Sequence, residues 1–436
     1  MINGSFPCRT MTLTIAINTL REALRKKTLY VLIGLGLLVM LVLPVIPTTD
    51  EPDARIKMML VVFFQIVVLL CIAGVIFLSA TSLPHEIEDR TIYGILSKPI
   101  ARVKVIMGKI LGFALLSAIL LAILGLLNMA VIQHLASNLP EEYRGIVKAR
   151  TEFAASQFDI QGKLHHAREG ITWIEGGRAG IARWTFSDLR KKPANKSAFE
   201  AEFSPKIESS RGFVDTIPLV VRVEDTNLRR SKTEVLPARV DKPFIVKIDT
   251  ESVQENSVMH ITVFPVHPTD YIGVTQEDVK VFSIQKGFVS NYTKAVIITF
   301  LKFLLIIVIA VMGSTYLSAP VSIVSAFVVF LCGHILEYIK DFSLLIQCND
   351  VHDHVLPAML EKPNILLVYM DYLIKKPLEW ISFVLPDFKR FDSLKFLLKG
   401  INIPIETVGV SFGYTAVYAG ICLFISAIIF KKREFL

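Results

Sequence analysis

The sequence is poor in cysteine, with five among 436 residues. They are Cys8, Cys71, Cys332, Cys348 and Cys422. Only Cys348 falls in a segment that we predict to lie outside the cell membrane, because the others lie in apolar runs or in the N-terminal arm. One cysteine cannot form a disulfide framework. An exported domain of this chain must therefore be held together by its own hydrophobic core.

Several catalytic motifs are also absent. The sequence has no G-x-x-x-x-G-K-[ST] phosphate loop, since "GKILG" and "GGRAG" lack that spacing. H-E-x-x-H, paired-cysteine metal motifs and G-x-S-x-G are missing as well. We therefore expect no catalytic residue and no cofactor on this chain, and no ATP hydrolysis by a phosphate loop of its own.

Long apolar runs are abundant. Hydrophobic residues make up 53% of the chain, and runs of about 18 or more apolar residues predict membrane-spanning helices. Six such runs are present: Thr28–Ile46, Lys57–Ala80, Ile110–Ile132, one within Ala295–Leu317, one within Ala319–Ile339, and Gly409–Phe430. The predicted fold class is an α-helical polytopic membrane protein with an inserted extracytoplasmic α+β domain.

The basic residues predict the orientation. Segments 1–27, 81–109 and 431–436 each carry an excess of Lys and Arg, and together these excesses equal the formal net charge of +8. Short cytoplasmic segments are enriched in Lys and Arg. Six spans place all three segments on one side, so we predict an inner or plasma membrane protein with both termini in the cytoplasm. The basic pI follows from this topology and does not indicate nucleic-acid binding.

This pattern divides the chain into six parts. They are a cytoplasmic arm with an interfacial helix (1–27), three spans with the cytoplasmic loop 81–109 (28–134), an extracytoplasmic domain (135–294), two spans (295–339), extracytoplasmic or interfacial helices (340–408), and the last span with a basic tail (409–436).

The extracytoplasmic domain has two kinds of pattern. Residues 141–158 favour a helix, whereas 217–224, 244–249, 259–265 and 279–284 alternate in the manner of strands. Short strands separated by turn-rich stretches are typical of an antiparallel β-sandwich. The predicted domain is thus a β-sandwich with a helical lead-in, with Trp173 and Trp184 in its core or at its edge. An envelope protein is a candidate partner for 135–294.

The N-terminal arm contains an amphipathic stretch. Leu13, Ile17, Leu20 and Leu24 recur on one helical face, and Arg25 lies off it. This pattern predicts a helix in the membrane interface, in contact with lipid. The alternative is an ordinary cytoplasmic helix that packs on protein.

Two further groups of residues have candidate roles. Lys302 and Glu337 lie inside predicted spans and form a candidate intramembrane pair, although snorkelling of each side chain to the headgroups is the simpler interpretation. The stretch "CNDVHDHV" places Cys348, His352 and His354 at a spacing that can ligate zinc or copper. Such loops are also common without metal, and we predict no metal site.

The loop 81–109 links the second and third spans. Pro84 suits a helix start, Glu86, Glu88 and Asp89 supply acid to its first turn, and Pro99 would end it. A short cytoplasmic helix held by two spans is well placed to transmit force from a partner. A solvated loop with basic residues is the alternative on composition alone.

The stretch "SLPHEIEDRTIYGILSKPIARVKVIMGKILG" resembles the first cytoplasmic loop of type-2 ABC transporter permeases, with their pattern E-x-E-x-x-T-x-x-x-L-L-S-x-P-x-x-R…GK. The matching residues are Glu86, Glu88, Thr91, Leu96, Ser97, Pro99, Arg102, Gly108 and Lys109, while Ile95 departs from the usual leucine. The run Ala16–Lys27 and the ending "FKKREFL" are also similar, so that the resemblance covers 11–134 and 295–436. Nothing in it extends to 135–294.

The resemblance implies a type-2 exporter permease fold and a transport subunit that works as a homo- or heterodimer. ATP and Mg would be bound by a separate ATPase subunit, which docks on 81–109. The residues expected to couple the two subunits are Glu86, Glu88, Arg90, Thr91, Tyr93, Ser97, Pro99 and Arg102. Three other hypotheses stay open: a membrane-anchored scaffold or mechanical signal transmitter, a secondary transporter, and an intramembrane enzyme.

Overall fold

The computed structural model describes residues 8–42, 52–91, 94, 101–137, 258–347 and 385–432, and within 148–257 the strands given below with a few adjoining residues. The chain forms two compact units. The helical unit comprises Met1–Arg144, Tyr292–Leu398 and Ile403–Leu436, and the β unit comprises Gly145–Asn291 and Lys399–Asn402.

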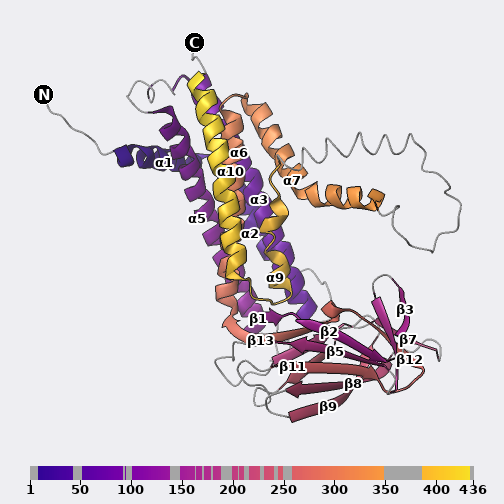
Figure 1. The fold of residues 1–436 in the computed structure, drawn as a ribbon. Helices are drawn as coiled ribbons and strands as arrows, with labels where there is room; N and C mark the ends of the chain where they lie inside the picture. Colours follow the sequence, from indigo (N-terminus) through magenta and orange to yellow (C-terminus); the bar gives the residue numbers. More distant parts are fainter. Residues whose placement is uncertain are drawn as a thin grey trace. The chain divides into compact units, whose positions relative to one another are not determined.

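Most long helices of the helical unit are apolar and lie side by side, whereas the N-terminal helix Cys8–Arg25 lies across them (Figure 1). The elements of this unit are α1 (Cys8–Arg25), α2 (Lys27–Val42), α3 (Pro52–Glu88), α5 (Arg102–Ser137), α6 (Phe288–Ser314), α7 (Ala319–Gln347), η6 (Phe388–Phe391), α9 (Leu394–Leu398) and α10 (Ile405–Lys432). α1 and α3 pack on α5, α2 and α7 pack on α3, and α10 packs on α5.

Four of these helices have the length and composition to cross a membrane. They are Met58–Glu88, Arg102–Leu135, Phe288–Ser314 and Ile405–Lys431, and the apolar stretches Lys27–Val39 and Ala319–Ile335 are shorter. The chain is therefore a membrane protein with about four long apolar helices among the described residues, and the count of six spans stays a prediction.

Pro84 does not start a separate helix, contrary to the expectation. It lies inside α3, which continues to Glu88. Pro84 is buried and the adjoining Leu83 is fully buried. A proline removes one backbone hydrogen bond, and apolar membrane helices tolerate this loss when packing and nearby hydroxyl groups compensate. The carbonyl that loses its helical donor is that of Ala80, four residues before Pro84.

The β unit consists of thirteen strands among the described residues. They are β1 (Lys148–Phe153), β2 (Gln157–Gly162), β3 (Leu164–Arg168), β4 (Ile171–Glu175), β5 (Gly180–Phe186), β6 (Phe199–Phe203), β7 (Lys206–Ser209), β8 (Thr216–Asp225), β9 (Arg230–Arg239), β10 (Phe244–Ile248), β11 (Met259–Pro265), β12 (Asp270–Val274) and β13 (Val279–Gly287). The strands predicted at 217–224, 244–249, 259–265 and 279–284 are confirmed as β8, β10, β11 and β13.

These strands form three antiparallel sheets. Their orders are β1-β13-β6-β10, β2-β5-β11-β8-β9 and β3-β4-β12-β7. Buried side chains from the first two sheets, such as Phe199, Val281 and Ile261, belong to one hydrophobic cluster. The two sheets therefore pack face to face, as expected for a sandwich. Trp184 is 1% exposed in this core, and its indole Nε1–H donates to the Thr275 carbonyl at 3.1 Å.

The predicted helical lead-in is wrong for the described part of residues 141–158. Lys148–Phe153 forms β1 and pairs with β13, and β2 begins at Gln157. Ala, Glu, Lys and Arg favour helices when isolated, but the alternation Ala149, Thr151, Phe153 also suits a strand. Ala149 is fully buried and Phe153 contacts Phe199, so that burial in the sheet outweighs the local helix propensity.

A short piece of the chain between α9 and α10 belongs to the β unit. The Arg150 N–H donates to the Gly400 carbonyl at 2.7 Å, and the Asn402 N–H donates to the Arg150 carbonyl at 2.6 Å. Gly400 has φ 61° and is the second residue after the end of α9 at Leu398, as expected of a glycine that ends a helix. Residues 399–402 thus extend the edge of the first sheet beside β1.

Candidate functional site

The candidate site is built around the end of α3 and the beginning of α5. α3 ends at Glu88, and the next turn contains Arg90 with φ 56°. A non-glycine residue in this left-handed conformation costs about 1 kcal/mol or more. The side chains of Glu88, Arg90 and Thr91 are exposed at this turn. This turn therefore ends α3, and it exposes the anionic side chain of Glu88 and the cationic side chain of Arg90 to solvent.

Lys109 is the most deeply buried charged group of this region. It lies in α5 and is only 1% exposed. Its Nζ is 2.6 Å from Glu86 Oε1 and donates to Ser82 Oγ, also at 2.6 Å. A buried ammonium group needs such partners, because its transfer out of water is costly. The Glu86–Lys109 pair therefore fastens the last turns of α3 to the first turns of α5.

Glu86 thus points into the helical unit. Its side chain is 17% exposed, and Oε2 has no hydrogen-bond partner in the part of the chain that the structure describes. The prediction that Glu86 takes part in coupling stays untested. The placement indicates an internal connection between two helices, whereas Glu88 has a 62% exposed side chain beside His85.

Arg102 forms a second connection, between α5 and α10. Its Nη1 donates to the backbone carbonyls of Phe430 at 2.7 Å and Lys431 at 3.1 Å. These carbonyls lie in the last turn of α10, where backbone oxygens lack helical partners and the helix dipole favours a cation. Because Arg102 starts α5, the two helix ends are tied together next to loop 81–109.

We expect Arg102→Gln to loosen the end of α10. A neutral side chain loses the charge-assisted bonds and the dipole interaction, together about 1 kcal/mol. Backbone amides of residues 428–432 should then exchange several-fold faster in hydrogen–deuterium exchange, with Arg102→Lys showing a smaller change. Equal exchange in both variants and the wild type would contradict this role.

The helix α1 packs on α5 through a pair of glycines four residues apart, Gly108 and Gly112. A Cβ atom at Gly108 would lie 2.7 Å from Ile15 Cγ2, and one at Gly112 would lie 2.7 Å from the Ala16 carbonyl oxygen. Real Cβ atoms do not approach so closely. Small residues in this pattern let helix backbones meet at short range. The two glycines of the stretch "GKILG" therefore allow α5 to contact α1 closely.

The predicted apolar face of α1 points away from α5. The exposed fractions are 55% for Leu13 and 38% for both Ile17 and Leu24. Leu20 is half-buried and Arg25 is exposed. The opposite face, with Ala16, Thr19 and Ala23, is buried. This arrangement leaves a leucine-rich face for contact outside the unit, and the interfacial placement stays a prediction.

Other predicted residues fall into two groups. Thr91 Oγ1 donates to the Glu86 carbonyl at 3.3 Å. Tyr93, Ser97 and Pro99 lie outside the described residues, as do Cys348, His352 and His354. In the part of the chain that the structure describes, three or more His, Cys, Asp or Glu side chains do not gather in a way that could hold a metal ion.

The intramembrane candidate Lys302 has a contact of another kind. It is 9% exposed, with Nζ 3.5 Å from His334 Nε2 and 5.6 Å from the Phe330 ring centre. The side chain of Glu337 lies outside the described part. The observed neighbours are therefore an imidazole and an aromatic ring, both of which suit a cation that is largely removed from solvent.

Sequence reasoning missed Lys109 and Ser82 as partners, and it missed α10 as the partner of Arg102. A signal was present for Lys109, because it stands at the start of a long apolar run and between two glycines, Gly108 and Gly112. Only the fold could identify the α10 carbonyls, because backbone acceptors carry no sequence signature.

No protein-family model and no curated protein matches this sequence. Among solved structures, similarity is found to carbohydrate-binding modules. One was solved with beta-1,4-galactotriose (10% identity, TM-score 0.20, 30% of this chain and 90% of that one). A xylan-binding domain from Paenibacillus barcinonensis is 11% identical with a TM-score of 0.20, and the match covers 33% of this chain and 92% of that one. A family 11 module from Clostridium thermocellum, solved with a mixed-linked tetrasaccharide, is 11% identical with a TM-score of 0.18. That match covers 31% of this chain and 90% of the module. At these identities and TM-scores, the similarities assign neither a family nor a ligand to this chain.

Proposed function

We propose that this chain is the membrane subunit of an ATP-driven exporter of the type-2 ABC class. It would form the export path as a homo- or heterodimer, and a separate ATPase subunit, which binds ATP and Mg, would dock on loop 81–109. The ATPase would lie in the cytoplasm, on the side of both chain termini. The proposal rests on the sequence resemblance together with one structural observation.

That observation is the anchoring of loop 81–109 at both ends. Lys109 joins α3 to α5 through Glu86, and Arg102 joins α5 to α10. A push on the exposed turn at Glu88–Thr91 would therefore act on three helices together. Buried, charge-assisted contacts of this kind resist bending better than a solvated loop does. This is what a coupling element requires, and it favours coupling over a passive loop.

The exposed charges at the turn provide the test. We expect the double variant Glu88→Lys/Arg90→Glu to weaken ATPase docking at least about tenfold, because it reverses both signs at the proposed contact without altering net charge. Docking is measured by co-purification of the ATPase from native membranes in mild detergent. Glu277→Lys, at an exposed position of the β unit, is the control. Undiminished docking of the double variant would contradict the proposal.

A second function, mechanical signalling through the β unit, is favoured by the contacts of residues 399–402. The buried side chain of Asn291 donates from Nδ2 to the Ile401 backbone carbonyl at 2.8 Å. The β unit is thus connected to α6, which follows β13 at Phe288, and to α10, which begins at Ile405. Binding of an envelope partner could be transmitted along both connections.

Asn291→Ala tests this connection. The loss of a buried hydrogen bond costs about 1 kcal/mol, so the amide of Asn402 should exchange roughly fivefold faster while the β11 amides stay protected. An exporter would keep most of its transport in this variant. A transmitter that relies on residues 399–402 would lose its output, and that result would favour the second function.

A further inference from the structure

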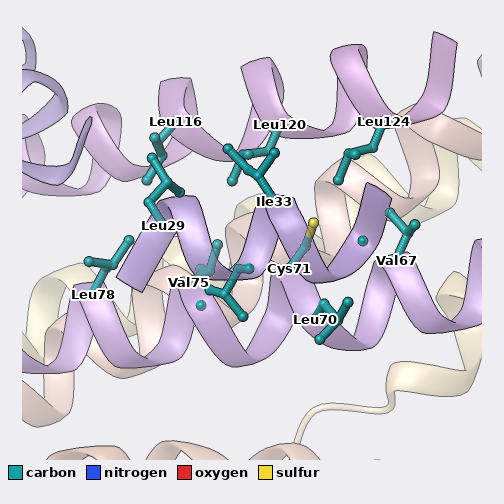
Figure 2. A pocket seen from close by; sticks show the side chains of 13 residues that line it. Leu29, Ile33, Val67, Leu70, Cys71, Val75, Leu78, Leu116, Leu120 and Leu124 are labelled. Atoms are coloured by element: carbon teal, nitrogen blue, oxygen red, sulfur yellow. The ribbon is translucent and has the colours of Figure 1, made fainter. Parts of the chain in front are cut away.

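The apolar side chains between α2, α3 and α5 fit together closely. Figure 2 shows Leu29, Cys71 and Leu120 around the space that they leave. Its volume is about 10 Å³, which is about the size of one water molecule. This space has no room for a larger ligand, and polar groups that could bind one lie in the β unit instead.

The sheet β2-β5-β11-β8-β9 carries polar side chains at the centre of one face. Its central strand, β11, contributes three residues to the hydrophobic core, each at most 1% exposed: Met259, Ile261 and Val263. Successive side chains of a strand point to opposite faces. Thr262 therefore points to the outer face of the sheet, which is the face turned away from the core.

Two arginines flank Thr262 on this outer face. Thr262 pairs with Arg183 on β5 and with Arg222 on β8, the strands on either side of β11 (Figure 1). Directly opposed residues of neighbouring strands have their Cβ atoms about 4.5–5.5 Å apart. The residues before and after each arginine belong to the core: Ala182, Trp184, Val221 and Val223. A hydroxyl group and two guanidinium groups are thus carried by adjacent positions of one face.

This group contains buried polar atoms without partners. Thr262 is 5% exposed, and its Oγ1 has no hydrogen-bond partner among the described residues. The same holds for the buried Nε of Arg183. Arg222 has a long, partly exposed contact, with Nη1 3.8 Å from Glu224 Oε1, and such pairs interact weakly. Because buried polar atoms in folded proteins are nearly always paired, the pattern points to a group supplied from outside the chain.

The donors favour a carboxylate. A guanidinium fork can donate two parallel hydrogen bonds to a carboxylate, and a hydroxyl can donate one more. Two acceptors lie beside them, since Asp159 of β2 pairs with Arg183, and Glu224 lies two residues along β8 from Arg222. Their charges would repel a doubly charged phosphate group, but they can accept hydrogen bonds from hydroxyl groups. A carboxylate with neighbouring hydroxyl groups is the chemistry of a sugar acid.

The apolar side chains of this face suit a sugar ring better than a protein partner. Ile181, Val220 and Phe264 lie two residues along their strands from the arginines and Thr262, and all three are half-buried. They can cover the C–H face of a ring without projecting from the sheet. Protein interfaces are usually anchored by large side chains that insert into the partner, and Phe264 is too deeply set for this.

We propose that the outer face around Thr262 binds a uronic acid unit of an acidic polysaccharide. The carboxylate would lie between Arg183 and Arg222 and accept a hydrogen bond from Thr262 Oγ1. Ring hydroxyl groups would donate to Asp159 and Glu224. This inference concerns the β unit alone and does not depend on the exporter proposal.

Calorimetric titration of the full chain in mild detergent with an α-1,4-linked galacturonate oligomer provides the test. The wild type should bind this oligomer at least tenfold more tightly than the same oligomer with its carboxyl groups reduced to alcohols. Arg183→Gln should weaken binding about tenfold, because it removes one guanidinium fork. Arg239→Gln is the matched control and should leave affinity unchanged. This arginine is exposed and lies six residues along β9 from Thr233, the partner of Arg222, which is roughly 20 Å.

Thr262→Val gives a second readout that separates binding from folding. Without ligand, this variant should unfold at a temperature equal to or above that of the wild type, because the hydroxyl that it removes has no partner. It should nevertheless bind the galacturonate oligomer at least threefold more weakly. A lower unfolding temperature would show that the hydroxyl is needed within the protein, and would overturn its role as a donor to the ligand.

Three further results would overturn the proposal. They are equal affinity for the galacturonate oligomer and its reduced form, equal affinity of Arg183→Gln and Arg239→Gln, and no binding of either galacturonate or mannuronate oligomers. Inorganic phosphate that competes as strongly as free galacturonate would overturn the sugar acid and assign a phosphate ligand to the site.

Discussion

Lys109→Met is expected to destabilise the helical unit by about 3 kcal/mol. The substitution keeps the length and apolar stem of the side chain and removes only the ammonium group. Glu86, whose side chain is 17% exposed, would then hold a carboxylate without its cation, and Ser82 would lose its donor. Removal of one partner of a buried ion pair costs more than the pair itself contributes, because the remaining charge stays desolvated.

The double variant Lys109→Met/Glu86→Gln separates these two effects. It removes both charges, so we expect it to recover more than half of the lost stability, as seen when buried pairs are replaced together. Equilibrium unfolding in mixed detergent and SDS gives the free energies. Lys431→Met, which changes an exposed lysine, is the control and should have little effect. If Lys109→Met were as stable as this control, the Glu86–Lys109 pair would not fasten α3 to α5.

Gly112→Leu is expected to detach α1 from α5. Even a methyl group at this position would lie 2.7 Å from the Ala16 carbonyl oxygen and from Thr19 Cβ. The backbone of α1 cannot move aside without leaving the contact, because a Cβ at Gly108 would also lie 2.7 Å from Ile15 and 3.1 Å from the Thr12 carbonyl oxygen. Overpacking of a tight contact costs about 1–3 kcal/mol of stability. Because this variant loses a whole helix contact, we expect a cost at the upper end of that range.

Limited proteolysis measures this effect directly. Cleavage after Arg21, Arg25 and Lys26 by trypsin should become roughly tenfold faster in Gly112→Leu. Gly413→Leu, on α10, is the matched control, since a Cβ there meets no atom within 4 Å. Transport or signalling should fall together with α1 docking, because α5 carries both Lys109 and the contact with α1. Unchanged cleavage would show that the glycine pair is not needed for this contact.

The sequence predicts the helical part well where apolar runs are long. The second, third, fourth and sixth predicted spans correspond to the four helices that are long and apolar enough to cross a membrane. It fails at Pro84, because a proline that suits a helix start is also tolerated inside a buried apolar helix. Short-range pattern cannot distinguish these two cases, since the difference lies in the packing around Leu83 and Pro84.

The β unit shows the same limit. Strands with clear alternation, such as β8 and β11, are predicted by the sequence. β1 is not, because its Lys, Arg and Glu favour a helix until Ala149 and Phe153 are buried against partners that are remote in sequence. At the candidate site, the sequence marks the loop and the residues Glu86 and Arg102. The sequence cannot show that Glu86 faces Lys109 or that Arg102 faces the carbonyls of α10, since both contacts depend on helix packing.

Isolation of the full-length chain from its native membrane in mild detergent, followed by mass spectrometry of its partners, tests the central claim most directly. The account predicts a stoichiometric protein with a phosphate loop, whose binding is lost in Glu88→Lys/Arg90→Glu and kept in Glu277→Lys. Co-purification of an envelope protein without any phosphate-loop subunit would contradict it, and would leave residues 145–291 as the functional part of the molecule.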